Sequence, residues 1–410
     1  MLRPFAGLRP ASEYAAQVAA PPYDVLSTEE ARAAARGKPW SFLHVSKPEI
    51  DLPAGADPYS PQVYAKAAEN MRHMLERGVL KRDEKPCYYV YRMVMNGHAQ
   101  TGLAAAGSVP DYDAQRIRRH ELTRPDKEDD RVRQIEAVNA HTGPVLLAYP
   151  AAPEVDAMLA DAARSAAEFD VTAAGGVHHM LWVIRDDERI ARLTAAFDAM
   201  GALYIADGHH RTAAASRVAA SRRAAASQPS ANASYERFLC VAFPHHALRI
   251  LPYNRVVRDL NGLERGELLR RVAARFNVAR ASGRVMPERR GVFGLYLPGE
   301  WYRLEIPAAN IPADDPIARL DISLLSAHLL GPVLAIGDPR TDPRIDFVGG
   351  IRGTEELERR VAGGMAAAFS MYPTSMEDLM AVADAGGIMP PKSTWFEPKL
   401  ADGLVSLVLD

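Results

Sequence analysis

The chain has too little cysteine to be held together by disulfides. Cys87 and Cys240 are its only cysteines in 410 residues, too few for a disulfide framework or for a zinc site built on cysteine. Apolar residues flank both, so we expect both thiols in the core. This cysteine usage is typical of a reducing compartment, and we expect the protein in the cytoplasm.

Neither sign of charge predominates, and long apolar runs are missing. The 49 lysines and arginines nearly balance the 51 aspartates and glutamates, which leaves a formal net charge of -2. Such a chain has no overall basic field for nucleic acid, so any anion site must be local. No uncharged apolar run approaches the ~20 residues that span a bilayer, and the first residues contain no signal-like apolar stretch. We therefore expect neither nucleic acid nor a membrane as a partner.

Several common catalytic motifs are also missing. The sequence contains no glycine-rich dinucleotide fingerprint, no nucleophile elbow and no His-Glu-x-x-His zinc motif. Residues 387–393 resemble a phosphate-binding P-loop only in part, because the second glycine is missing and Pro390 and Pro391 have no N–H to donate. Lys392 could still contact a phosphate as a point charge, although an exposed lysine in a turn is the simpler interpretation.

The sequence does contain a dense polar hexapeptide at 206–211, Ala-Asp-Gly-His-His-Arg. It follows an apolar run at 203–205 and precedes an alanine-rich segment. The pattern predicts a strand, a one-glycine turn and a helix whose first turn carries three basic side chains. Cations there disfavour the helix by roughly 0.3 to 1 kcal/mol each when charged, and a bound anion would reverse that effect. The predicted phosphate-binding residues are Gly208, His209, His210 and Arg211, directly after Asp207.

A purely structural interpretation of the hexapeptide stands beside this one. Asp207 is a good helix N-cap, its carboxylate can pair with Arg211 one turn later, and Gly208 can simply be the flexible residue of a tight turn. The phosphate site is favoured because few simple caps place two imidazoles and a guanidinium in succession.

Acidic residues could complete a phosphoryl-transfer site. Such a site needs positioning, charge neutralisation and a carboxylate that orients the attacking hydroxyl. Asp24 follows two prolines that hold it in a defined loop, and Glu121 lies in a densely charged segment at 120–133. Each acid taken alone is more simply a cap or a surface charge. The acidic groups able to hold Mg²⁺ or accept a proton are Asp24, Glu121, Asp207 and the cluster at 126–130. Asp207 and Glu121 are the predicted Mg²⁺ ligands, and Arg124 and Lys392 are predicted as further nucleotide contacts.

Apolar periodicity predicts a mixed α+β protein with two lobes. A helix is expected at 59–77, and strands at 88–95 and 100–109 are joined by an Asn-Gly hairpin turn. Residues 1–235 are expected to form an N-terminal lobe that carries the hexapeptide. Residues 236–410 are expected to form a second α+β lobe, whose Met-Pro-Pro-Lys-Ser-Thr loop at 389–394 closes over the site.

Five motifs resemble, in order and spacing, those of domain-of-unknown-function family 1015, and the resemblance runs nearly end to end. They are Arg-Pro-Phe at 3–5 with Gly-Leu-Arg-Pro at 7–10, Ala-Pro-Pro-Tyr-Asp-Val at 20–25, His-Glu-Leu-Thr at 120–123, the hexapeptide and the loop at 389–394. That family is distantly similar to the ParB N-terminal domain and sulfiredoxin superfamily, in which such a strand-turn-helix element binds nucleotide phosphates. The resemblance implies a nucleotide-binding core of this kind with large insertions and a second mixed-sheet lobe.

Free serine kinases are similar in the same element, and they move a phosphoryl group from ADP or ATP to free L-serine. The resemblance thus implies a Mg²⁺-dependent kinase for a small hydroxylated metabolite, with free serine as the best single candidate. It also implies Asp24 or Glu121 as the catalytic carboxylate beside Asp207, because each lies in a motif shared with the family. Sulfiredoxin chemistry is disfavoured because His209 stands in place of the cysteine, and a ParB role because no helix-turn-helix is recognisable. A non-catalytic nucleotide-responsive protein remains the main alternative, and a metal-dependent phosphatase or nuclease a weaker one. A homodimer is left open.

Overall fold

The computed structural model describes residues 1–173 and 175–410 and divides the chain into two compact units. The first unit contains residues 1–248 and 398–410, and the second contains residues 249–397. The expected division at 236 differs from this, because strand β12 (Arg237–Pro244) is an interior strand of the first sheet. The last thirteen residues also belong to the first unit, where Ala20 pairs with Asp402 and Leu8 with Ser406.

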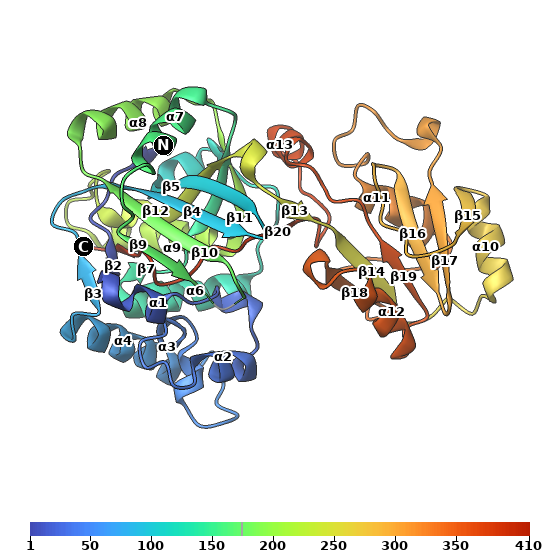
Figure 1. Ribbon diagram of the computed structural model, residues 1–410, viewed down its shortest axis with the longest axis horizontal. Helices are drawn as coiled ribbons and strands as arrows, with labels where there is room; N and C mark the ends of the chain where they lie inside the picture. The colour runs from blue at the N-terminus through green and yellow to red at the C-terminus, as the bar shows by residue number, and fades with distance from the viewer. Residues whose placement is uncertain (174) are drawn as a thin grey trace. The chain divides into compact units, whose positions relative to one another are not determined.

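The first unit is built on a mixed nine-stranded sheet (Figure 1). Its order is β6-β11-β8-β12-β5-β4-β10-β9, with β1 paired to β5. β12 runs parallel to β8, whereas β11 is antiparallel to β8. The remaining strands are β1 (Leu2–Arg3), β4 (Tyr88–Met95), β5 (His98–Ser108), β6 (Ile117–Arg118), β8 (Val145–Tyr149), β9 (Phe169–Thr172), β10 (His178–Ile184) and β11 (Leu203–Asp207).

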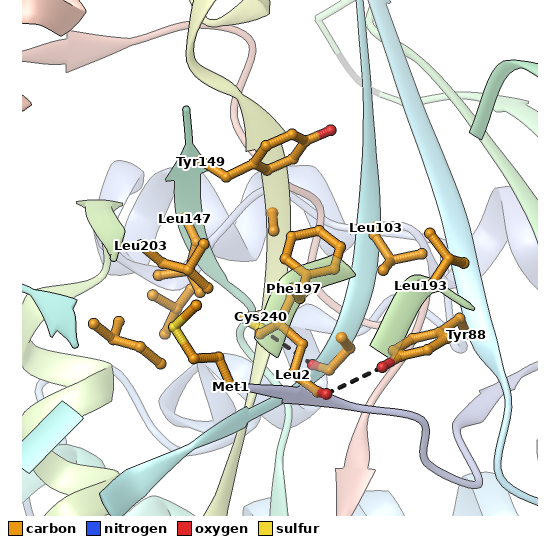
Figure 2. Packing of buried hydrophobic residues seen from close by; sticks show 14 of the residues in the cluster. Met1, Leu2, Tyr88, Leu103, Leu147, Tyr149, Leu193, Phe197, Leu203 and Cys240 are labelled. Carbon is orange, nitrogen blue, oxygen red and sulfur yellow. Dashed lines mark hydrogen bonds between the residues drawn. The ribbon is translucent and has the colours of Figure 1, made fainter. Parts of the chain in front are cut away.

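Three helices pack on this sheet and share one apolar core with it: α7 (Pro153–Ala162), α8 (Asp187–Ala199) and α9 (His209–Ala225). Figure 2 shows Phe197 and Leu193 of α8 beside Leu103 and Cys240 of the sheet. Both cysteines are buried, as their apolar neighbours predicted.

A small helical layer forms the other part of the first unit. It contains α2 (Thr28–Ala35), α3 (Leu43–Ser46), α4 (Pro61–Glu76) and α6 (Pro125–Val138), and α6 packs against both α4 and α9. Ser27 and Glu30 form a capping box at the start of α2, which satisfies two N–H groups that the helix itself leaves unpaired. The N-termini of α6 and α9 lie side by side, where Arg124 donates its N–H to His210.

The second unit has a six-stranded sheet of its own, in the order β15-β17-β16-β19-β14-β18. Its strands are β14 (Tyr253–Val257), β15 (Asn277–Ala281), β16 (Val292–Leu297), β17 (Glu300–Glu305), β18 (Ile345–Gly349) and β19 (Ala367–Ser370). Helices α10 (Arg265–Ala273), α11 (Asp321–Leu325), α12 (Glu355–Ala362) and α13 (Met376–Asp384) complete it. Two apolar clusters lie wholly within this unit. The predicted mixed α+β fold with a second mixed lobe is therefore confirmed. Throughout the described ranges, the model contains no helix long and apolar enough to cross a membrane.

Candidate functional site

The predicted strand-turn-helix element is present at the hexapeptide. β11 ends at Asp207, Gly208 has φ 100° and ψ 28°, and α9 begins at His209. This left-handed conformation favours glycine, and a Cβ at position 208 would lie 3.3 Å from the Cα of Val145. No side chain caps the N-terminus of α9 within the described part of the chain. The first N–H groups of α9 are therefore free to donate hydrogen bonds to a bound anion, as the sequence predicted.

Asp207 is not the N-cap of α9, since Gly208 occupies that position. Its Oδ2 accepts a hydrogen bond of 2.8 Å from the Nζ of Lys399. Burial alone would raise the pKa of Asp207, but the charges of Lys399 and Arg211 lower it well below its usual range. An ionised carboxylate and an ammonium thus lie side by side at the start of the helix.

Arg211 points into the protein and links three segments. Its Nη1 donates to the carbonyl of Pro144 at 2.6 Å, and its Nη2 donates to Oδ2 of Asp24 at 3.1 Å. The guanidinium also lies 5.5 Å from the ring centroid of Tyr23. Burial alone would lower the pKa of Arg211, but Asp24, Tyr23 and other acidic groups raise it. Arg211 therefore stays charged and holds the Tyr23–Asp24 loop against α9.

His209 is buried and pairs with the segment at 120–121. Its ring packs edge to face with His120 at a centroid distance of 4.5 Å, and its Nε2 accepts from the N–H of His120. The other ring nitrogen, Nδ1, lies 3.5 Å from Oε2 of Glu121. Burial and His120 lower the pKa of His209 well below its ordinary value. The ring is therefore neutral, and its hydrogen bonds assign the proton to Nδ1, facing Glu121.

His210 and Arg124 connect the start of α6 to the start of α9. Nε2 of His210 accepts from the N–H of Arg124 at 3.1 Å, while the exposed guanidinium of Arg124 pairs with Asp126. Burial lowers the pKa of His210 as well. Neither imidazole of the hexapeptide is thus a cation near neutral pH. The basic character of the site comes from arginine and lysine instead.

A polar cluster next to Arg211 was not predicted from the sequence. The guanidinium of Arg131 lies 3.7 Å from the centroid of the Tyr23 ring and forms a 2.7 Å ion pair with Asp130. Asp402 reaches this cluster from the C-terminal segment and is 1% exposed. Burial raises the pKa of Asp402 to about 7, against the lowering effect of Arg211.

Two contributors therefore come from the C-terminal segment, Lys399 and Asp402. The only sequence signal for Lys399 was its place in the side-chain-rich loop that follows residue 389. Asp402 repeats the Asp-Gly doublet of 207–208 and is likewise followed by a glycine with positive φ, Gly403 at 87°. That doublet is too common to identify a site by itself.

The structure brings all but one of the predicted residues together in the first unit. Lys392 lies in the second unit, where its carbonyl accepts from Arg255 and its ammonium lies 5.8 Å from the Tyr253 ring.

Across the described residues, no group of three or more His, Cys, Asp or Glu side chains is placed to hold a metal ion. Asp207 and Glu121, the predicted Mg²⁺ ligands, have Lys399 and His209 as their respective neighbours.

Residues 2–323 match the model of a family described as a protein of unknown function, DUF1015. The chain belongs to this family. No match was found among the curated proteins. Solved structures with some likeness to this DUF1015 protein include a mutant free serine kinase in complex with AMP, which is 12% identical, with 72% of this chain and 86% of that chain covered and a TM-score of 0.37.

Two further structures have a similar level of likeness. SbnI from Staphylococcus aureus, with a C-terminal truncation, is 11% identical, with 74% and 87% of the two chains covered and a TM-score of 0.39. A conserved hypothetical protein from Pyrococcus furiosus is 12% identical, with 73% and 93% covered and a TM-score of 0.34. Likeness at this level assigns no activity to the present chain.

Proposed function

We propose that this protein is a nucleotide-dependent kinase that transfers a phosphoryl group from ATP or ADP to the hydroxyl of a small metabolite, with free L-serine as the acceptor. One observation carries the proposal. The uncapped start of α9, after the left-handed Gly208, has the Asp207–Lys399 ion pair beside it, and Arg211 of the same helix turn binds the half-exposed carboxylate of Asp24. The first turn of α9 therefore offers a place for phosphate and, through Arg211, holds a carboxylate for the acceptor.

Each residue has a defined task in this proposal. The N–H groups at the start of α9 and the Lys399 ammonium bind phosphate oxygens. Asp24 accepts the proton of the attacking hydroxyl, while that oxygen bonds to phosphorus and the bridging P–O bond to ADP or AMP breaks. Arg211 orients Asp24 through the 3.1 Å hydrogen bond. Glu121, which is half-exposed beside His209, is the second candidate for the base. Mg²⁺ would neutralise phosphate charge, held chiefly by the nucleotide, with Asp207 and Glu121 as the proposed protein ligands.

The direct test incubates the full chain with ATP or ADP, MgCl₂ and L-serine and measures O-phosphoserine by mass spectrometry, with a panel of other hydroxylated metabolites alongside. We expect Asp24→Asn to lower kcat by roughly 10²- to 10⁴-fold, with the nucleotide Kd from calorimetry unchanged. If Glu121→Gln has this effect and Asp24→Asn does not, Glu121 is the base.

Other outcomes separate the competing functions. Nucleotide binding without turnover of any acceptor would contradict the kinase and favour a nucleotide-responsive regulatory protein. Hydrolysis that needs no acceptor hydroxyl would favour a phosphatase. Absence of any nucleotide binding would overturn the phosphate site itself.

A further inference from the structure

A small polar cavity lies beside Arg211 within the first unit. It encloses about 30 Å³ and is lined by α6, by the turn at 141–143 and by the C-terminal segment. A single water needs roughly 10–15 Å³. The cavity therefore has room for a small charged group, about two to three waters in size, and is far too small for a nucleotide.

Four side chains that line the cavity each present an unsatisfied polar atom. All four are at least nine-tenths buried, and these atoms have no hydrogen-bond partner among residues 1–173 and 175–410. An unsatisfied buried polar group costs about 1–3 kcal/mol, so four of them around one cavity indicate a ligand with complementary groups. The atoms are Ser46 Oγ, His141 Nε2, Arg211 Nε and Asp402 Oδ1.

These atoms define which chemistry fits. Nε of Arg211 can only donate. His141 hydrogen-bonds the backbone of Arg237, and burial lowers its pKa to about 4, so the ring is neutral and its second nitrogen, Nε2, is an acceptor. Asp402 Oδ1 is an acceptor when ionised, and the Ser46 hydroxyl can do either. The cavity thus offers one cationic donor, two acceptors when Asp402 is ionised, and one hydroxyl that can also accept.

The charged groups beside the cavity include one more carboxylate than guanidinium. The guanidinium groups of Arg131 and Arg211 face three carboxylates, those of Asp24, Asp130 and Asp402. An ammonium beside the ionised Asp402 is attracted by this excess and supplies three N–H donors. A carboxylate on the same ligand pairs with Arg211, so the net charge of the site stays unchanged.

Gly143 lies beside the donor Arg211 and one of the acceptors, Asp402. A Cβ at this position would lie 3.4 Å from Oδ1 of Asp402 and 3.5 Å from Nε of Arg211. A ligand atom near that point therefore contacts both groups. The backbone of Gly143 has no positive φ, so its conformation does not require glycine. The missing side chain therefore serves to leave space in the cavity.

We infer that this cavity binds the head group of an α-amino acid, with its ammonium donating to Asp402, His141 and Ser46 and its carboxylate accepting from Arg211 Nε. The inference rests on the proposed function, since this amino acid is its phosphoryl acceptor. Arg211 joins the two, because its Nη2 holds the Asp24 carboxylate while its Nε faces the cavity.

The test measures binding to the full chain by calorimetry, with and without ADP. L-serine is compared with 3-hydroxypropionate, which lacks the ammonium, and with ethanolamine, which lacks the carboxylate. We expect each analogue to bind at least roughly 100-fold more weakly than L-serine, because each leaves buried polar groups unpaired. Equal binding of L-serine and 3-hydroxypropionate would overturn the inference, as would no binding of any of the three.

Two variants test the location. Gly143→Ala fills the cavity without removing a polar group and should lower L-serine affinity at least about 10-fold, whereas Gly201→Ala, with nothing within 4 Å of its Cβ, should not. Asp402→Asn should weaken L-serine and leave 3-hydroxypropionate unaffected. If the Asp402→Asn variant fails to fold, the Gly143→Ala variant tests the location alone. An L-serine affinity of Gly143→Ala equal to that of the natural protein would contradict the site.

ADP affinity, measured in the same samples, separates the two proposals. Binding of ADP without L-serine would overturn the amino-acid cavity and leave the nucleotide site standing. Binding of L-serine without ADP would do the reverse.

Discussion

Arg211 is the side chain of the hexapeptide that reaches into the interior of the first unit, where it contacts Pro144, Asp24 and Tyr23. Its guanidinium is buried, holds Asp24 and the carbonyl of Pro144, and faces Asp402 through the cavity. A charge in this position affects stability as well as binding, because its acidic partners lose their countercharge when it is removed.

Replacement of this charge by a side chain of similar length should therefore destabilise the fold. We expect Arg211→Met to lower the free energy of unfolding by about 3 kcal/mol, measured by urea denaturation. Arg217→Met on the same helix is the matched control, because Arg217 pairs with Glu128 and Asp129 at the surface and should cost less than about 1 kcal/mol. Equal losses for the two variants would contradict the role of Arg211.

Asp402 should make stability depend on pH in a defined direction. Its pKa is about 7 in the folded protein because burial disfavours the charged form, against about 4 in an unfolded chain. Between these values the folded protein retains a proton that the unfolded chain has released, so the free energy of unfolding falls as pH rises from about 4 to about 7.

Asp402→Asn cannot release this proton. Relative to the natural protein, the variant should gain stability across the same interval, by about 4 kcal/mol at pH 8 compared with pH 4. Urea denaturation at several pH values measures the difference in stability between the variant and the natural protein. Burial also raises the pKa of Asp321 to about 7, but this contribution is the same in both proteins and cancels. A difference that does not change with pH would contradict the raised pKa.

For single residues, the sequence predicted which side chains meet at the site better than it predicted their charge states and partners. Asp207, Gly208 and Arg211 do meet at the start of α9, as local spacing required. His209 and His210 were expected to carry positive charge, but burial keeps both neutral, and burial is a tertiary property that the hexapeptide does not encode. Lys399 was missed because it lies 192 residues from its partner Asp207.

The element that positions the site is the junction of β11 and α9. Apolar strand residues, one glycine and an alanine-rich stretch determine it locally, which is why the sequence predicted it. The boundary between the two units was harder to predict from the sequence. β12 belongs to the first unit because it pairs with β5 and β8, which lie about 130 and 95 residues earlier in the chain.

Gly208 should be the most sensitive position of this junction. Gly208→Ala forces a left-handed φ on a residue with a Cβ, close to Val145 of β8, and should lower stability by about 1–3 kcal/mol. The displaced start of α9 should also weaken ADP binding in calorimetry. Gly201→Ala, just before β11, provides the control and should be close to neutral in both measurements. ADP binding unchanged by Gly208→Ala would argue against a phosphate site at this helix start.

At the scale of the whole molecule, the second unit is an insertion into the first. Its two ends are adjacent, because β13 (Ile250–Leu251) pairs with β20 (Trp395–Phe396) and the N–H of Glu397 donates to the carbonyl of Arg249. Its apolar clusters contain only its own residues. Such a unit has what it needs to fold independently.

We expect residues 249–397, expressed alone, to give a cooperative thermal unfolding transition and well-dispersed amide signals in NMR. We also expect the first unit to fold when a short glycine-serine linker replaces 249–397, since the two junctions lie beside each other. An unstructured fragment in either experiment would contradict the division into two units.

The return of residues 398–410 to the first unit determines the order in which the molecule can be completed during translation. A ribosome synthesises the whole nine-stranded sheet, and then the entire second unit, before Lys399 and Asp402 exist. Nascent chains arrested before residue 398 should therefore contain a formed sheet but neither the ion pair at Asp207 nor the acidic wall of the cavity. Ligand binding would begin only after the C-terminal segment has emerged, so an unfinished chain could not sequester nucleotide or amino acid.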